Sequence, residues 1–148
     1  SRRPAMTSAE IHAFCEHYAR AVERSDASAL AASYSENCEV SSPIFGVLNG
    51  RPKLESSWRD LFRAFSDTMV QITDVIVDET RRDRAVLLFS SYGVHKGEIF
   101  GVPGTGRRFE IRGAFVFTFE GDKICKETRL YDFTGMLVQL GILKAKAS

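Results

Sequence analysis

Residues 109–119 read FEIRGAFVFTF and hold the clearest period-two pattern in the chain. Successive side chains of a β-strand point to opposite faces of its sheet, so alternating apolar residues indicate a strand with one buried face. The predicted buried side chains are Phe109, Ile111, Phe115, Phe117 and Phe119. The predicted outer side chains are Glu110, Arg112, Ala114, Val116 and Thr118.

Three more predicted strands surround this segment. Gly121-Asp122 is a turn signal that leads into a strand over 123–133. Residues 85–95 predict a long strand that precedes the central one. Residues 70–77 alternate as well, with a predicted bulge near Thr73-Asp74. These strands follow one another along the chain, so the sequence predicts a meander of antiparallel strands.

Helices precede the meander. Apolar residues recur at helical spacing after Ser8, which is the predicted N-cap of the first helix. Asp26 is the predicted cap of a second helix that extends to about Tyr34. Pro52 stands at a favourable first-turn position for a third helix.

Helices and strands therefore occupy separate parts of the chain, which is typical of an α+β fold. A short strand over 38–42 follows the second helix, and a short helix over 134–140 follows the last strand. We predict one cone-shaped domain over residues 8–141, with three N-terminal helices packed on a curved antiparallel sheet. Residues 1–7 are predicted to be a disordered tail or a cloning remnant, and residues 142–148 a C-terminal tail.

The composition argues against several classes of function. With 20 basic and 19 acidic residues the net charge is +1, which gives no electrostatic reason to expect nucleic acid or a membrane as partner. Cys15, Cys38 and Cys125 form no metal-binding motif, and their odd number favours reduced thiols and a cytoplasmic location. No metal-ligand spacing or cofactor motif is present, so we expect neither a metal nor a cofactor. The 11 phenylalanines favour a pocket for a small hydrophobic molecule.

Three stretches carry a family resemblance. The first runs from Tyr18 through Asp26 and Tyr34 to Cys38-Glu39-Val40 and Pro43; the second is GVHKGE at 93–98 with GVPGTGR at 101–107; the third is Glu127, Arg129 and Tyr131-Asp132 with QLG at 139–141. Together they cover nearly the whole chain and resemble the SnoaL-like branch of the nuclear-transport-factor-2-like superfamily. The resemblance implies a cone-shaped fold and a homodimer. It does not fix an activity, because the superfamily includes isomerases, dehydratases, epoxide hydrolases, cyclases and non-catalytic pocket proteins.

The positions that carry catalysis in ketosteroid isomerases are only partly filled here. The tyrosine of the first helix is present as Tyr18. The position of the carboxylate base holds Ser42, and the position of the carboxylic acid holds Phe115. A serine without an adjacent base does not abstract a carbon-bound proton at neutral pH, so the resemblance does not predict steroid isomerisation.

Two other activities depend on an aspartate of the closing strand. Limonene-epoxide hydrolase uses an Asp-Arg-Asp relay to activate water. The corresponding positions here are Arg129 and residues near Ser90 and Tyr92, so the relay is absent. The acid/base aspartate of the polyketide cyclases also falls at Arg129. The proton carrier of the family is therefore replaced by a fixed cation.

Glu127, Arg129 and Tyr131 share one face of the closing strand by alternation, and the resemblance places this face inward. In one interpretation Glu127 and Arg129 neutralise each other or connect strands, since unpaired buried charges are costly. In the other, Arg129 binds a carbonyl, enolate or carboxylate of the substrate. Glu127 is then a candidate general base if it reaches the substrate.

Tyr18 and His95 complete the candidate catalytic set, Tyr18 as a donor to a substrate carbonyl and His95 as a proton shuttle. The competing interpretations are a core tyrosine and a hydrogen-bonded histidine at a strand bend; the sequence does not decide which face His95 occupies. The candidate substrate-binding residues are Ser42, Trp58, Tyr92, Phe115 and Tyr131. For Trp58 and Phe115 the alternative is packing in the core.

These residues support three hypotheses. The first is a cofactor-free isomerase or lyase of the cyclase type, in which Arg129 and Tyr18 polarise a carbonyl and Glu127 or His95 moves a proton. The second is a non-catalytic binding or assembly module, and the third and weakest is an epoxide hydrolase. We further expect a homodimer that pairs through the outer sheet face, which carries Glu110, Arg112 and Val116.

Overall fold

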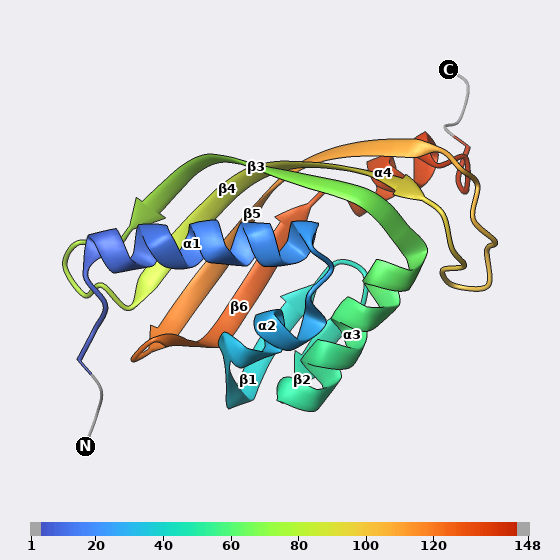
Figure 1. Cartoon of the computed structure of the whole chain (residues 1–148). Coiled ribbons are helices and arrows are strands. Elements are labelled where there is room, and N and C mark those ends of the chain that lie inside the picture. The colour runs from blue at the N-terminus through green and yellow to red at the C-terminus, as the bar shows by residue number, and fades with distance from the viewer. Residues whose placement is uncertain (1–3, 145–148) are drawn as a thin grey trace.

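A mixed sheet of six strands forms the frame of the molecule in the computed structural model, which describes residues 4–144. In chain order the strands are β1 (Tyr34–Ser42), β2 (Gly46–Asn49), β3 (Phe65–Val77), β4 (Arg84–His95), β5 (Arg108–Glu120) and β6 (Lys123–Tyr131). They lie in the spatial order β2-β1-β6-β5-β4-β3 (Figure 1). Strands β3 to β6 form the predicted antiparallel meander.

One pair of neighbours corrects the prediction of a wholly antiparallel sheet. Strand β1 runs parallel to β6, with Val40 opposite Glu127. Two strands joined by a short hairpin must pair antiparallel. Most of the chain separates β1 from β6, so these two strands can pair in either relative direction. Strand β2 was not predicted, and it returns antiparallel along β1. The predicted α+β class is confirmed with this mixed sheet.

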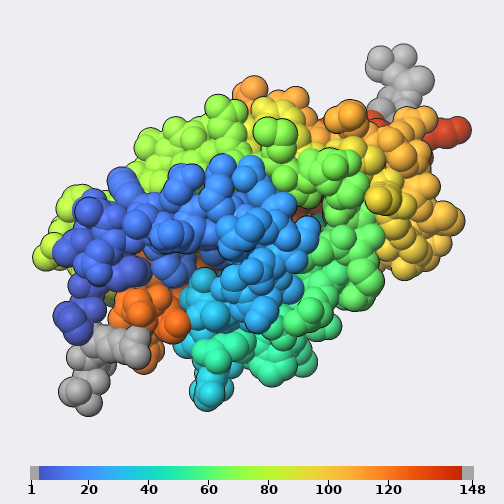
Figure 2. Space-filling model, viewed as in Figure 1, coloured from blue at the N-terminus to red at the C-terminus, as the bar shows by residue number. Residues whose placement is uncertain are grey.

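Helices α1 (Ser8–Glu23), α2 (Ala27–Ala32) and α3 (Arg51–Ala64) lie together on one side of the sheet, and the space-filling view shows α1 and α2 in front of it (Figures 1 and 2). Thr7, rather than the predicted Ser8, is the N-cap of α1, because its hydroxyl accepts a hydrogen bond from the Glu10 amide. The Glu10 carboxylate in turn accepts one from the Thr7 amide, which completes a capping box. Asp26 caps α2 as predicted. Helix α4 (Phe133–Gln139) follows β6.

Two predicted boundaries move because a helix ends earlier than its apolar spacing indicates. Helix α2 ends at Ala32, and Tyr34, predicted to close that helix, begins β1. Helix α3 ends at Ala64, so Phe65 starts β3 five residues before the predicted strand over 70–77. Both residues are aromatic and buried. A single buried aromatic residue fits the apolar spacing of a helix and that of a strand equally well.

Strand β3 is irregular at two places. Its pairing with β4 shifts between Ser66 and Met69, and again between Ile72 and Asp74, where the bulge was predicted. Extra residues of this kind bend a strand and increase its twist. The curvature brings β3 against α1, and a cavity lies between the helices and the inner face of the sheet.

The inner face of β5 is apolar as predicted, since Phe115, Phe117 and Phe119 are buried. Met6 belongs to the same core, although the predicted domain boundary placed it in the tail. Ile142, beyond the predicted end of the domain, packs against a second small core cluster. Of the predicted tails, residues 1–3 and 145–148 lie outside the described residues.

Candidate functional site

A cavity of about 100 Å³ lies between the helices and the inner face of the sheet. Its walls are nearly all apolar and come from α1, α3, α4 and strands β3 to β6. The apolar wall includes Val22, Phe62, Val70, Phe89, Ile111 and Met136. The volume is small for a ligand site, since typical small-molecule pockets measure about 300–1,000 Å³.

Five of the predicted site residues line this cavity. They are Tyr18 from α1, Trp58 from α3, Phe115 from β5, and Arg129 and Tyr131 from β6. Alternation along β6 places Arg129 and Tyr131 on the inner face, while Leu130 between them is 56% exposed on the other face. The structure thus brings these five predicted residues together at one cavity.

The Glu127–Arg129 pair is almost completely buried, with side chains 0% and 2% exposed. Nε of Arg129 donates to Oε2 of Glu127, and the Tyr34 hydroxyl donates to Oε1. Burial opposes the positive charge of Arg129, but the adjacent Glu127 carboxylate holds the pKa of Arg129 well above its ordinary value. The guanidinium therefore stays charged, and Glu127 has no carboxylate oxygen without a partner. The geometry matches the interpretation of mutual neutralisation, and Glu127 does not line the cavity.

Tyr34 belongs to this network but was not among the predicted site residues. Its hydroxyl lies 2.6 Å from that of Tyr18 and 3.5 Å from Nη2 of Arg129. Sequence reasoning assigned Tyr34 to the apolar side of α2, whereas it is the first residue of β1. Its presence in the first family-like stretch, after Tyr18 and Asp26, was the one signal that could have identified it.

The hydrogen bonds of the network have a defined direction. A carboxylate only accepts, so the single hydroxyl proton of Tyr34 goes to Glu127. Tyr18 must then donate to Tyr34, which leaves the lone pairs of Tyr18 as acceptors. Burial raises the pKa of both Tyr18 and Tyr34, so both hydroxyls stay protonated. The predicted hydrogen bond from Tyr18 to a substrate carbonyl would require Tyr18 to leave Tyr34.

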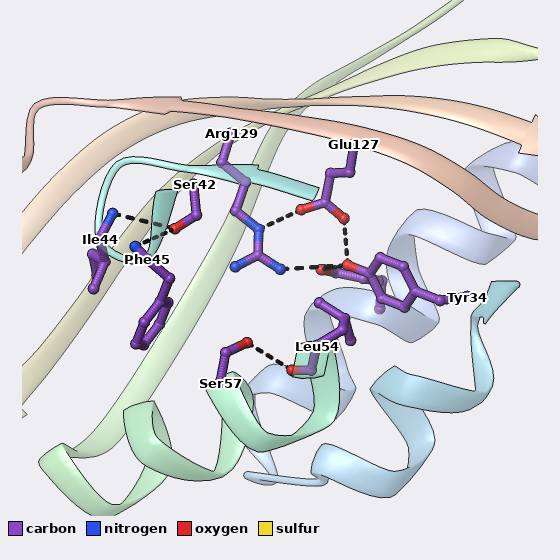
Figure 3. Close-up of polar contacts among 9 residues, drawn as sticks. Tyr34, Ser42, Ile44, Phe45, Leu54, Ser57, Glu127 and Arg129 are labelled. Carbon is purple, nitrogen blue, oxygen red and sulfur yellow. Dashed lines mark hydrogen bonds and ion pairs between the residues drawn. The ribbon is translucent and has the colours of Figure 1, made fainter. Parts of the chain in front are cut away.

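The guanidinium of Arg129 lies close to two aromatic rings. Its Cζ is 4.8 Å from the centroid of Trp58 and 5.2 Å from that of Phe115. Contacts of this kind stabilise a cation in a dry environment. Figure 3 shows Nε and one Nη of Arg129 engaged by Glu127 and Tyr34, while the other Nη points away from them without a drawn partner. Arg129 thus has one guanidinium nitrogen outside the hydrogen bonds with Glu127 and Tyr34.

Three further residues do not contact the cavity. Ser42 is buried, but its hydroxyl oxygen accepts hydrogen bonds from the amides of Ile44 and Phe45 and so supports a turn (Figure 3). Tyr92 is 37% exposed on the outer face of β4 and does not line this cavity. His95 is fully buried beside Phe65 and is also absent from the cavity wall.

His95 lies on the inner face of β4, because pairing with β5 is regular through Gly93 and no bulge reverses the alternation. Its Nδ1 accepts a hydrogen bond from the Thr105 amide at 3.3 Å and lies 3.0 Å from the Thr105 hydroxyl. Its Nε2 is buried without a hydrogen-bond partner in residues 4–144. This arrangement fits the alternative of a histidine at a bend, where it fixes the loop after β4.

The cavity wall contains no carboxylate and no imidazole among the described residues. Within residues 4–144, no three His, Cys, Asp or Glu side chains come close enough together to hold a metal ion. In the same part of the chain, no helix combines the length and the apolar character needed to cross a membrane.

The fold and the residues that line the cavity define a cone-shaped pocket protein. Its helices cover a curved sheet, and a buried polar network lies beneath an apolar cavity. The family model for SnoaL-like polyketide cyclases matches residues 12–140. The chain therefore belongs to the SnoaL-like polyketide cyclase family, and the resemblance inferred from the sequence is confirmed. A comparison with curated proteins gives no significant match.

Several solved structures share the fold. TsrD from Streptomyces laurentii has a TM-score of 0.80 at 24% identity, covering 93% of this chain and 99% of TsrD. AclR from Streptomyces galilaeus, a candidate hydroxylase, has a TM-score of 0.81 at 22% identity, covering 96% and 87% of the two chains. A candidate SnoaL-like polyketide cyclase from Jannaschia has a TM-score of 0.81 at 13% identity, covering 97% and 99%. At these identities the likeness concerns the fold alone.

Proposed function

We propose that this protein binds a small apolar molecule with a carbonyl group and acts on it as a cofactor-free isomerase or lyase of the cyclase type. The observation that carries the proposal is the charged Arg129, which lines an apolar cavity with one guanidinium nitrogen outside its pair with Glu127. The ligand's carbonyl oxygen is expected to accept a hydrogen bond from this nitrogen, while its apolar part contacts Trp58 and Phe115.

The reaction type follows from what a fixed cation stabilises. Removal of a proton beside a carbonyl group moves negative charge onto the carbonyl oxygen. A donor that is held in place before the reaction stabilises that charge without reorganisation, and most strongly where water is excluded. Trp58, Phe115 and Glu127 hold Arg129 in such a position. The site is therefore suited to an enolate-like transition state.

A matched pair of ligands tests the role of Arg129. The ketone 2-indanone and the hydrocarbon indane have nearly the same shape and differ in one carbonyl group. A hydrogen bond to a charged group contributes about 1.5–3 kcal/mol, so we expect the wild-type protein to prefer the ketone roughly 10- to 100-fold. Isothermal titration calorimetry measures both affinities.

The control variant removes both charges together, as Glu127→Gln with Arg129→Met, because removal of Arg129 alone leaves a buried carboxylate unpaired. This double variant should bind 2-indanone and indane with equal affinity. A wild-type protein that binds the two ligands equally would contradict the proposed role of Arg129.

A second candidate function is a non-catalytic binding or assembly module. The observation that favours it is the full engagement of Glu127, together with the lack of any other carboxylate or imidazole in the described wall of the cavity. It predicts binding of ketones without turnover. An epoxide hydrolase is the weaker alternative, because Ser90, Tyr92 and Arg129 supply no carboxylate to activate water. Assay of small epoxides tests it.

We also propose that the chain forms a homodimer through the outer face of the sheet. Several large apolar side chains are exposed on outward positions of β3, β4 and β6, namely Met69, Ile76, Tyr92 and Leu130. Exposed apolar patches of this kind are typical of protein interfaces. Light scattering at micromolar concentration should give twice the mass of one chain, and Leu130→Lys should shift the protein to a monomer.

A further inference from the structure

We propose that Tyr18 and Tyr34 form a proton relay between the pocket and the buried carboxylate of Glu127. The inference rests on the proposed function, since it supplies the base that the cavity wall lacks. Tyr18 lines the cavity, and its hydroxyl oxygen lies 2.6 Å from that of Tyr34. The Tyr34 hydroxyl in turn donates to Oε1 of Glu127.

The relay is buried. Tyr18 is 3% exposed, Tyr34 0% and Glu127 1%. Each hydroxyl already donates to the next group in the chain, so the Tyr18 oxygen on the pocket side can act only as an acceptor. Glu127 has no direct contact with the cavity, and His95 has none either. The two tyrosines therefore form a path of hydroxyl groups from the cavity to the Glu127 carboxylate.

The reaction consists of three proton transfers that take place together, and it balances. A substrate proton beside the carbonyl passes to the oxygen of Tyr18, and the hydroxyl proton of Tyr18 passes to Tyr34. The hydroxyl proton of Tyr34 passes to Oε1 of Glu127. The electron pair of the broken C–H bond stays on the substrate as an enolate, both tyrosines end neutral, and Glu127 becomes a carboxylic acid. Reverse transfer returns the proton to a different carbon of the substrate, which completes an isomerisation.

The charge of Arg129 explains why such a transfer is favourable in a buried site. Before it, the positive Arg129 is balanced by the negative Glu127. After it, Glu127 is neutral and the same guanidinium is balanced by the enolate. The net charge of the buried site is zero in both states, so neither state exposes an unpaired charge to a low-dielectric environment. The relay exchanges one anionic partner of Arg129 for another.

Hydrogen exchange at the carbons beside the carbonyl of 2-indanone tests the relay. NMR spectroscopy in D2O measures how fast the wild-type protein and its variants replace these hydrogens with deuterium. Positioned acid–base groups contribute about 100- to 10,000-fold to a proton transfer. Tyr34→Phe should therefore lower kcat for exchange by at least about 100-fold, with KM within about twofold of the wild-type value.

Ser57→Ala is the matched control, because it also removes one buried hydroxyl and its hydrogen bond, here to the carbonyl oxygen of Leu54 at 2.6 Å. This variant should keep the wild-type kcat. A general loss of packing would instead lower the melting temperature and kcat of both variants alike, and that result would overturn a specific role for Tyr34.

The remaining outcomes separate the relay from the proposed function. If Tyr34→Phe exchanges at the wild-type rate while the Glu127→Gln, Arg129→Met variant does not, the relay is wrong and the role of Arg129 stands. If the wild-type protein binds 2-indanone but catalyses no exchange, the relay is overturned and the pocket is a binding site. If the wild-type protein does not bind the ketone, the proposed function fails together with the relay.

Discussion

At the scale of single residues, Arg129 combines two demands that usually conflict. A buried guanidinium needs a counter-ion, yet one fully enclosed by acceptors has no donor left for a ligand. Glu127 takes Nε, and the rings of Trp58 and Phe115 contact the guanidinium. Arg129 also lines the cavity. A lysine at this position would be a point charge without the planar faces that the rings contact.

This arrangement predicts strong coupling between Glu127 and Arg129 in stability. Removal of one partner of a buried pair typically costs about 3–5 kcal/mol, whereas joint removal is often close to neutral. We therefore expect Arg129→Met and Glu127→Gln to lower the free energy of unfolding markedly as single changes, and much less together. Urea unfolding of all four proteins in the cycle measures the coupling. Single costs that simply add in the double variant would show that the pair is not energetically linked.

The sequence predicted part of this site for a clear physical reason. Alternation on a regular strand places Glu127, Arg129 and Tyr131 on one face, whatever the rest of the fold does. Tyr34 could not be placed in this way, because it reaches Glu127 across 93 positions of sequence through the parallel pairing of β1 with β6. Tyr92 was misplaced because the aligned position in a related enzyme carried no information about the face of β4 that this side chain occupies.

At the scale of secondary structure, α1 holds the edge strand β3 through the backbone of a single residue. The carbonyl oxygen of Val70 accepts a hydrogen bond from Nη2 of Arg20 at 2.8 Å, and its amide donates to Glu23 at 2.8 Å. Both groups lie just after the first irregularity of β3, where the ladder with β4 is interrupted. Two side chains of α1 thus replace the strand neighbour that an edge strand lacks.

Glu23→Ala should therefore loosen this edge of the pocket. Loss of one hydrogen bond to a charged group that is 24% exposed is expected to lower the free energy of unfolding by about 1 kcal/mol. The amide of Val70 should also exchange its hydrogen faster in hydrogen–deuterium exchange experiments. The control is Glu16→Ala, which removes an exposed ion pair with the same Arg20 and should change stability by less than about 0.5 kcal/mol. Equal effects of both changes would count against the clamp.

The loop after β4 gives a second prediction at this scale. The amides of Lys96 and Gly97 both donate to the carbonyl oxygen of Ala64, at the end of α3. A Cβ added at Gly97 would lie 2.1 Å from the carbonyl oxygen of Arg63, so Gly97→Ala must displace the loop or the helix end. We expect a loss of about 1–3 kcal/mol in thermal unfolding experiments. Lys96→Ala, which shortens an exposed side chain in the same loop, should have little effect.

Elements with a strong period were predictable, and those decided by distant contacts were not. The long strands β4 and β5 and the helices α1 and α3 follow from their own apolar spacing. Strand β2 has only four residues, Gly46–Asn49, and exists because β1 offers it a ladder of hydrogen bonds. The parallel direction of β1 against β6 likewise depends on how the helices carry the chain back to the far side of the sheet.

At the scale of the whole molecule, the cone encloses the buried phenol groups of Tyr18 and Tyr34 and the half-buried phenol of Tyr131. Burial is the largest cause that raises the pKa of Tyr18, of Tyr34 and of Tyr131, the last to about 12. In the unfolded chain these phenols titrate near pH 10. Above that pH the unfolded state has therefore lost protons that the folded state still holds, and unfolding becomes more favourable as the pH rises.

The free energy of unfolding should accordingly be constant with respect to these groups below about pH 9 and fall between about pH 10 and 12, by about 1.4 kcal/mol per pH unit for each buried tyrosine that stays protonated. Urea unfolding at intervals from pH 8 to pH 11.5 measures the slope. Tyr131→Phe should make the free energy of unfolding fall less steeply with pH, because it removes one tyrosine with a raised pKa. Tyr92→Phe changes a phenol that is 37% exposed on the outer face and should leave the slope in place. A slope that responds equally to both changes would mean that the pocket tyrosines are open to water, and the buried relay from Tyr18 to Glu127 would then lose its physical basis.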